Sequence, residues 1–234
     1  SVKTGELTAN LKLRRSQIFL KYEERIDSAC SNRQERDPQF LADSPRKTKK
    51  WPSLLPRWLR YRIYRSLATV PLNPPKDLIL KLAQTKEELE QALRLLHDSY
   101  VGAGFMTPHP SGMRVTPYHA LPQTTTLIAL RNDEVVATVS VIRDGAFGLP
   151  LDAIFDMARL RKERGRIAEI SSLAIKTEYR HDRETLLLLI KFLYEYCIHY
   201  FGVDCMVAVV NPKMADFYRA ILFFEVMERG NVKE

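Results

Sequence analysis

Two β-rich runs joined by a short polar turn constrain the fold of this 234-residue chain most strongly. Residues 125–130 and 135–142 are rich in Thr, Val, Ile and Leu, and the sequence Arg-Asn-Asp-Glu at 131–134 lies between them. Asn and Asp favour tight turns, so this segment predicts an antiparallel β-hairpin. Strand and helix patterns alternate around it, which favours parallel neighbours. A chain with both signals is expected to form a mixed sheet.

The flanking segments supply the other elements. Thr85 and Glu88 form a capping box at the start of a helix whose apolar residues recur up to Tyr100. Residues 101–124 form a long loop of the kind that carries function. Further strands are predicted over 77–83, 167–175, 204–210 and 223–228, and further helices over 151–162, over 183–201 with Asp182 as the cap, and after Asn211-Pro212.

Charge divides the sequence near residue 70. The chain carries 36 Lys and Arg against 28 Asp and Glu, a net charge of +8. Residues 1–70 hold 16 of the basic and 7 of the acidic residues, so the remainder is close to neutral. We therefore predict a basic N-terminal extension and linker over residues 1–70, with helical patterns at 12–30 and 57–67, and a second domain over 71–234.

The composition disfavours several classes of protein. No apolar run approaches the roughly 18 to 20 residues that span a bilayer, and no secretory-signal pattern opens the sequence. Three cysteines, Cys30, Cys197 and Cys205, show no CxxC spacing. This argues against a disulfide framework or a cysteine-based zinc site, and fits a reducing cytoplasm. Cys197 and Cys205 are interpreted as small core residues.

The predicted strand 167–175 carries the first candidate catalytic group. Two-residue periodicity places Glu169 and Ser171 on one side together with Leu173 and Ile175, unless a bulge resets the phase. Burial raises the pKa of a carboxyl group, which suits a general base near neutral pH. A glutamate on an edge strand that faces water or an arginine is the alternative.

The segment from Asn211 to Phe223 carries the second candidate. Phe217 and Tyr218 lie on the apolar face of the predicted helix, where core packing is one interpretation. A buried tyrosine hydroxyl needs a partner, however, and can donate a proton to a leaving group.

These segments resemble a known superfamily. The pattern N-x5-F-Y-x4-F from Asn211 to Phe223 is similar to the last motif of the GNAT acyltransferases, as is the order of elements over 77–229. Within that superfamily, the chain resembles bacterial N-acyl amino acid synthases and the related acyl-homoserine-lactone autoinducer synthases. Five motifs carry this resemblance: Tyr100-x-x-x-Gly104-Phe105, Pro110-Ser-Gly-Met-Arg114, Leu121-Pro-x-Thr124-Thr125-Thr126, Gly148-Leu-Pro-Leu-Asp152 and Ala168-Glu-Ile-Ser-Ser-Leu-Ala174.

The resemblance implies an α/β (α+β) fold, in which a GNAT-like mixed and splayed central sheet is flanked by helices and preceded by the basic extension. The sheet would part between strands 167–175 and 204–210, where the acyl-phosphopantetheine arm of the donor would enter. No permanently bound cofactor and no metal site are expected. The implied donor-binding residues are Leu173, Ala174, Ile175, Arg180, Arg183 and Asn211.

Two positions depart from the resembled patterns. Ordinary members bind the coenzyme A diphosphate through R-x-x-G-x-G/A, whereas here the sequence from Arg180 to Thr185 has larger residues at both glycine positions. This favours acyl carrier protein as the donor, with coenzyme A held by Arg180 and Arg183 as the alternative. Ser172 replaces the arginine of autoinducer synthases, which disfavours a homoserine-lactone product.

The long loop holds the candidate acceptor contacts. Arg114 is suited to pair with an acceptor carboxylate, and Phe105 is a further candidate substrate contact in the loop. Ser172, in the predicted strand 167–175, is another candidate substrate contact. The histidines at 109 and 119 are either loop surface, acceptor contacts or an alternative base. Apolar faces of 105–121 and 149–160 are candidates for the acyl pocket. The adjacent residues His97-Asp98-Ser99 are interpreted as structural, because neighbouring helix positions diverge too far to form a relay.

The predicted function is transfer of a long-chain acyl group from acyl carrier protein to the α-amine of an amino acid. Glu169 would be the base, Tyr218 the acid that protonates the thiolate, and Ser171 a third catalytic candidate. The alternatives are an acetyl- or acyl-CoA-dependent N-acetyltransferase, an autoinducer synthase, and a non-enzymatic basic module that binds anionic lipid or nucleic acid.

The expected partners are acyl carrier protein and the amino acid. Residues 46–65, rich in basic and aromatic side chains, are a candidate for peripheral membrane contact. Nucleic acid is disfavoured, because no nucleic-acid-binding fold is visible in the sequence. The expected location is the cytoplasm, with membrane association as an option.

Overall fold

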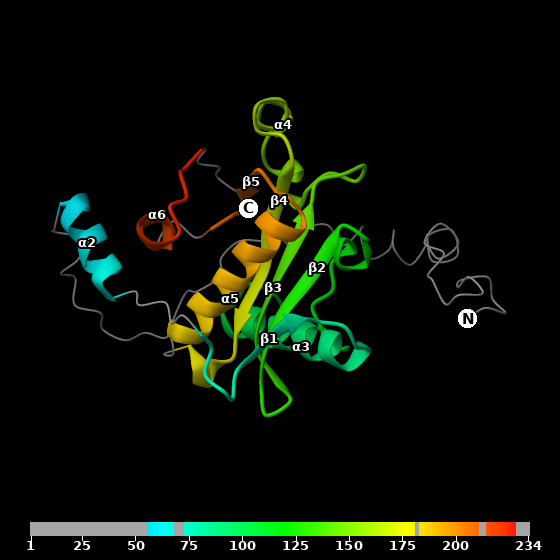
Figure 1. The fold of residues 1–234 in the computed structure, drawn as a ribbon. Helices are drawn as coiled ribbons and strands as arrows, with labels where there is room; N and C mark the ends of the chain where they lie inside the picture. The colour runs from blue at the N-terminus through cyan, green and yellow to red at the C-terminus, as the bar shows by residue number, and fades with distance from the viewer. Residues whose placement is uncertain (1–55, 68–72, 181–182, 211–213, 228–234) are drawn as a thin grey trace. The chain divides into compact units, whose positions relative to one another are not determined.

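The computed structural model describes residues 56–67, 73–180, 183–210 and 214–227 (Figure 1). The predicted helix at 12–30, the cap Asp182 and the residue Asn211 lie outside these ranges. The helices are α2 (Arg57–Leu67), α3 (Lys86–Gly102), α4 (Ala158–Arg164), α5 (Arg183–Glu195) and α6 (Ala215–Ile221). The strands are β1 (Ile79–Leu82), β2 (Thr124–Arg131), β3 (Glu134–Arg143), β4 (Ile167–Ile175) and β5 (Cys205–Val207).

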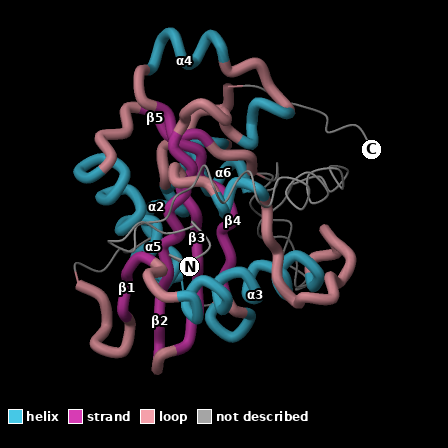
Figure 2. Tube along the Cα trace, turned by 90° about the vertical axis from the view of Figure 1, so that its right-hand side faces the viewer, coloured by secondary structure: helices cyan, strands magenta, loops and turns pink. Residues whose placement is uncertain are grey.

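The five strands form one sheet in the order β1-β2-β3-β4-β5. The first four strands are antiparallel to their neighbours, and β5 runs parallel to β4. Figure 2 shows the strands running side by side through the centre of the chain. The predicted mixed sheet is therefore confirmed.

The central hairpin forms where the sequence predicts it. Arg131 pairs with Glu134, so Asn132 and Asp133 make a two-residue turn with φ angles of 49° and 61°. Two positive φ values define the turn whose twist matches that of the flanking strands, and Asn and Asp tolerate this conformation better than most residues.

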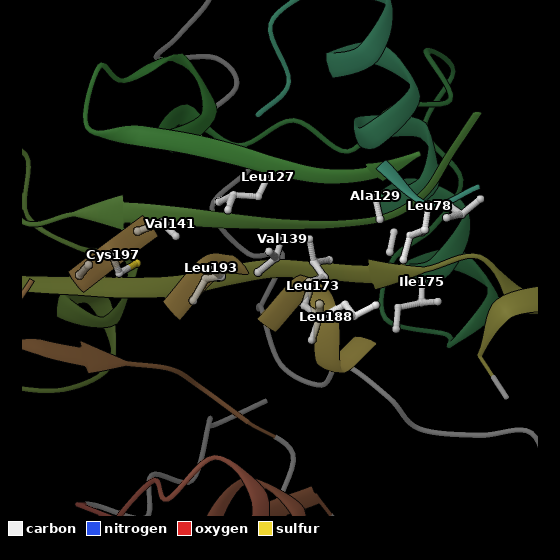
Figure 3. Close-up of a cluster of buried hydrophobic side chains, with 14 of the residues drawn as sticks. Leu78, Leu127, Ala129, Val139, Val141, Leu173, Ile175, Leu188, Leu193 and Cys197 are labelled. Atoms are coloured by element: carbon white, nitrogen blue, oxygen red, sulfur yellow. The ribbon is translucent and has the colours of Figure 1, made fainter. Parts of the chain in front are cut away.

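A helix covers each face of the sheet. Leu188 and Leu193 of α5 pack with Val139 of β3 in the largest buried cluster (Figure 3), and α5 crosses the sheet in Figure 1. On the other face, Leu96 of α3 packs with Ala174 of β4. The helix α3 begins at the predicted capping box, since Thr85 Oγ1 accepts the backbone N–H of Glu88 at 3.2 Å. The strands β3 and β4 are consequently covered on both faces of the sheet.

Three predicted elements differ from the observed ones. Residues 223–227 form no strand, so the described sheet ends at β5. The expected helix over 151–162 is divided into a 3₁₀ turn, Pro150–Ala153, and α4, because the buried Leu151 and the side chain of Asp152 anchor the intervening segment. The expected helix over 183–201 changes into a π-helical turn at Tyr196–Tyr200.

The helix α2, from the predicted basic extension, packs against α6. Arg60 Nη1 lies 2.8 Å from Asp216 Oδ2, and Arg65 Nε donates to the carbonyl oxygen of Ala220 at 2.9 Å. The Arg65 guanidinium also lies over the exposed Phe223 ring. Part of the basic charge noted in the sequence is thus used in a contact within the chain.

Candidate active site

Glu169 is a buried carboxylate in the sheet, on a strand that pairs with both β3 and β5. It lies on β4 and is only 3% exposed. The backbone N–H of Leu151, from the 3₁₀ turn that precedes α4, donates to Glu169 Oε2 at 2.8 Å. A hydrogen bond to a charged acceptor of this kind contributes about 1.5 to 3 kcal/mol. The water-facing alternative for Glu169 is therefore wrong, while its chemical role stays a prediction.

The strand β4 separates from β5 just beyond Glu169. Among the described residues, β5 pairs with β4 only over Ile167, Ala168 and Glu169. From Ile170 onward, no strand within the described ranges pairs with β4 on the side away from β3. This is the splayed sheet that the family resemblance implied, with the two strands parting next to the Glu169 carboxylate.

A β-bulge changes the direction of the side chains within β4. Ser171 pairs with Ser140 and Ala174 with Thr138, so Ser172 and Leu173 together oppose one residue of β3. Ser172 has a φ of 54°, a left-handed conformation that costs a residue with a side chain about 1 to 2 kcal/mol.

The bulge corrects the predicted side-chain pattern. Leu173 and Ile175 point into the core beneath α5, as Figure 3 shows, instead of sharing a face with Glu169. Ser172 takes their place on the Glu169 side, where its hydroxyl lies 3.5 Å from that of Ser171. The two-residue periodicity of the sequence allowed for a bulge in this strand, but it could not predict that the bulge occurs at Ser172.

His119 approaches this polar group from the long loop. Its Nε2 atom lies 3.4 Å from Ser172 Oγ. Its Nδ1 atom accepts the backbone N–H of Thr116 at 3.0 Å and lies 2.9 Å from Thr116 Oγ1. The structure therefore places His119 at the candidate site and not on the loop surface. Thr116 was missed in the sequence, although a Thr followed by Pro117 is a recognisable start of a helical turn.

The loop before His119 is fastened to one stripe of α3. The buried His97 accepts the backbone N–H of His109 on Nε2 at 3.0 Å, and Arg94 Nη1 donates to the carbonyl oxygen of Ser111. His97 Nδ1 also lies 2.9 Å from Asp98 Oδ1, so these two neighbouring side chains form a pair. Since Nε2 is used by a backbone group, the pair holds the loop and is no catalytic relay.

Arg114 and Phe105 both pack around Tyr100. The Arg114 guanidinium lies 4.1 Å from the centre of the Tyr100 ring, and Phe105 meets the same ring edge to face at 6.2 Å. A cation over an aromatic face is attracted by about 0.5 to 2 kcal/mol. These two predicted substrate contacts therefore also stabilise the loop on α3.

The predicted donor-binding arginines lie beyond the C-terminal end of β4. Arg180 and Arg183 are exposed, and Arg180 Nε donates to the carbonyl oxygen of Ile175 at 3.1 Å. Arg183 is the first residue of α5. The structure thus places both cations at one end of the strand and Glu169 nearer its other end.

Tyr218 lies on α6. Its described ring contacts are with Phe217 and Phe224, at centroid distances of 5.8 and 5.9 Å. Burial raises the pKa of the Tyr218 phenol to about 12, so the group stays protonated at neutral pH. It therefore has the protonation state that a proton donor needs, and it is supplied by an element other than β4.

Ionic contacts order the segment that supplies the Leu151 N–H. Arg161 Nε donates to Asp144 Oδ2, and Arg161 Nη1 to Asp152 Oδ1, both at 2.6 Å. The Arg161 guanidinium holds the pKa of the Asp152 carboxyl below its usual value. Asp152 Oδ2 in turn accepts the N–H of Leu149 at 2.6 Å.

Other predicted features have structural roles or no counterpart. Cys197 is completely buried, which raises the pKa of its thiol to about 11, and Cys205 packs at the edge of a second core cluster.

No metal-binding group of three His, Cys, Asp or Glu side chains occurs within the described ranges. In the same ranges, no helix combines the length and apolar character that crossing a bilayer requires.

The mixed, splayed sheet with helices on both faces defines the class as a GNAT-like acyltransferase fold. The structure of FeeM, an N-acyl amino acid synthase from uncultured soil microbes, matches with 23% identity and a TM-score of 0.52, covering 60% of this chain and 75% of that chain. An acetyltransferase from Trypanosoma brucei matches with 17% identity and a TM-score of 0.46, covering 68% and 99%. A predicted acetyltransferase from Clostridium acetobutylicum, solved with acetyl-CoA, matches with 14% identity and a TM-score of 0.49, covering 67% and 96%.

The sequence gives the narrower assignment. The family model of the N-acyl amino acid synthase FeeM matches residues 91–232, and the chain belongs to this family. It is accordingly an N-acyltransferase. A comparison with curated protein sequences gives no match.

Proposed function

We propose that the protein transfers a long-chain acyl group from the phosphopantetheine thioester of acyl carrier protein to the α-amine of an amino acid. The observation that carries this proposal is the buried Glu169 carboxylate, held by the Leu151 N–H beside the point where β4 leaves β5. A base next to the backbone N–H groups of a splayed strand is an arrangement suited to aminolysis of a thioester.

In the proposed reaction, Glu169 takes a proton from the ammonium group of the amino acid, directly or through one water molecule. The freed amine attacks the thioester carbonyl, and backbone N–H groups of β4 beyond Glu169 stabilise the oxyanion. Each such donor contributes about 3 to 4 kcal/mol in other acyl transfers. Collapse of the intermediate expels the thiolate, which Tyr218 protonates, and the second proton that the nitrogen loses returns to the Tyr218 phenolate, directly or through water.

The choice of donor rests on the segment from Arg180 to Thr185. Larger side chains occupy the positions where glycines would leave backbone N–H groups bare for a diphosphate. The exposed Arg180 and Arg183 remain suited to the single phosphate of a carrier-protein pantetheine. Transfer from coenzyme A is the competing proposal.

The test combines lipid analysis with a defined assay. Mass spectrometry of lipids from cells that express the wild-type chain should reveal N-acyl amino acids, which cells with Glu169→Gln should lack. The purified enzyme should then use palmitoyl-acyl carrier protein at least 10-fold more efficiently than palmitoyl-CoA. Equal or better use of palmitoyl-CoA would refute the carrier-protein donor, and full activity of Glu169→Gln would refute the base.

A further inference from the structure

Ser172 and His119 form a pair that the fold itself does not require. Ser172 holds a φ of 54°, a conformation that glycine adopts without strain, yet a serine occupies the position. The bulge turns this hydroxyl to the side of Glu169, where it is only 6% exposed. Strained residues that their surroundings hold in place occur preferentially at functional sites.

The contacts of His119 decide which ring nitrogen carries the proton. The backbone N–H of Thr116 points at Nδ1 over 3.0 Å. Because an N–H group can only donate, Nδ1 must present its lone pair, and the neutral ring carries its proton on Nε2. Nε2 faces Ser172 Oγ at 3.4 Å, so the imidazole donates and the hydroxyl accepts.

This direction of donation excludes Ser172 as a nucleophile activated by His119. An acyl-serine route needs Nε2 to accept the serine proton, and that nitrogen is already protonated. Ser172 therefore keeps its proton, and its hydroxyl accepts from His119. The hydroxyl of Ser171, at 3.5 Å, is at the outer limit for a hydrogen bond. The Ser172 O–H is thus available to a substrate.

The position of Ser172 on β4 suits a contact with the carbonyl oxygen of the thioester. It is the bulged residue of β4, so its backbone lies where the strand departs from regular pairing, three residues after Glu169. Backbone and side chain of the same residue then offer donors at one place. Preorganised donors at a point of developing negative charge are the main source of rate enhancement in acyl transfer.

We propose that Ser172 is a catalytic residue that donates its O–H to the thioester carbonyl oxygen, and that His119 is the positioning residue that holds this hydroxyl. The proposal rests on the proposed function. As the C–N bond forms, the carbonyl π pair moves onto the oxygen, where Ser172 stabilises it. When that pair returns, the C–S bond breaks and the thiolate takes a proton from Tyr218. The first proton of the ammonium group remains on Glu169, and the second proton that the nitrogen loses restores the Tyr218 phenol, directly or through water.

The experiment measures turnover of palmitoyl-acyl carrier protein with an equimolar mixture of proteinogenic amino acids. Ser172→Gly, which relieves the strained backbone, and Ser172→Ala should both lower kcat about 100-fold, with KM for the donor within about twofold. His119→Gln places a side-chain N–H near the former Nε2 position and should keep most of the activity. His119→Asn should lose about 10-fold, and Thr177→Ala, an exposed hydroxyl just after β4, should match the wild type.

Each part of the proposal has its own contrary result. Wild-type kcat in Ser172→Gly, or a covalent acyl adduct on Ser172 in intact-protein mass spectrometry, would overturn the role of the hydroxyl. If His119→Asn slowed the Ser172→Ala variant as much as it slows the wild type, the two residues would act independently and the positioning role would be wrong. An inactive wild type would instead refute the proposed function, and this proposal with it.

Discussion

The backbone N–H of Leu151 donates a 2.8 Å hydrogen bond to Oε2 of Glu169, although 18 residues separate the two in sequence. The contact joins the segment before α4 to the strand β4. It gives a buried carboxylate a fixed backbone donor, which orients the Oε2 atom. A base has to be held in this way and still be able to accept a proton.

Two replacements of Glu169 should separate the effect of the Leu151 contact on stability from the effect of the carboxylate on turnover. In Glu169→Ala, the buried Leu151 N–H loses its acceptor, and the free energy of unfolding should fall by about 1 to 3 kcal/mol. In Glu169→Gln, the amide oxygen keeps that acceptor, so stability should stay within about 1 kcal/mol. Both variants should lose at least about 100-fold in turnover. Urea denaturation and product assays measure the two effects, with Glu163→Gln on the surface of α4 as the control.

The turn at Asn132 and Asp133 predicts a substitution pattern. Asp133 has a φ of 61°, and a β-branched residue is strained there, so Asp133→Val should lower the free energy of unfolding by about 1 to 2 kcal/mol. Asp133→Asn, which tolerates the left-handed conformation, should leave it unchanged. Equal denaturation midpoints for the Val and Asn variants would contradict the turn geometry.

The Arg161 contacts predict a dependence of stability on pH. The pKa of Asp152 is lowered in the folded protein, mainly by its hydrogen bond with Arg161. The stability from this interaction is present above the unfolded-state value of about 3.9 and is lost as the pH falls through the lower folded value. Arg161→Met should therefore cost about 1 kcal/mol at pH 7, and progressively less below pH 4.

Thermal denaturation across pH 3 to 7 measures this effect, and Arg159→Met is the matched control. Arg159 pairs with Glu163 on the exposed surface of the same helix, so its removal should change stability little at any pH. A difference between Arg161→Met and the wild type that stayed constant with pH would show that the loss comes from packing.

The contact between α2 and α6 predicts a local change in dynamics. Asp216 lies 2.8 Å from Arg60 Nη1 and 3.5 Å from the Tyr61 hydroxyl. The substitution Asp216→Ala therefore removes both contacts at once. Hydrogen exchange of the α2 amides, Arg57–Leu67, should become faster by about 10-fold, the equivalent of about 1.4 kcal/mol. Glu225→Ala, an exposed acid near α6, should leave exchange unchanged. Unaltered protection in Asp216→Ala would mean that α2 is held by other contacts.

Local patterns were sufficient to predict most elements of the fold. The capping box at Thr85 and Glu88, the turn at 131–134 and the apolar run of β4 are each encoded within a few neighbouring residues. Propensity and periodicity act at that range, and the mixed sheet follows from their order. The closing strand at 223–228 failed as a prediction, because β-rich composition does not specify a pairing partner.

The sequence by itself determined which residue types were available for chemistry: a glutamate in an apolar strand, serines after it, and histidines in a long loop. Only the tertiary structure decided which of them meet. The bulge at Ser172 depends on how β4 pairs with β3, and it replaces Leu173 by Ser172 on the Glu169 side. His119 reaches Ser172 across 53 residues, and its proton position depends on the Thr116 N–H. Strand register and loop placement are long-range properties, so no local pattern contains them.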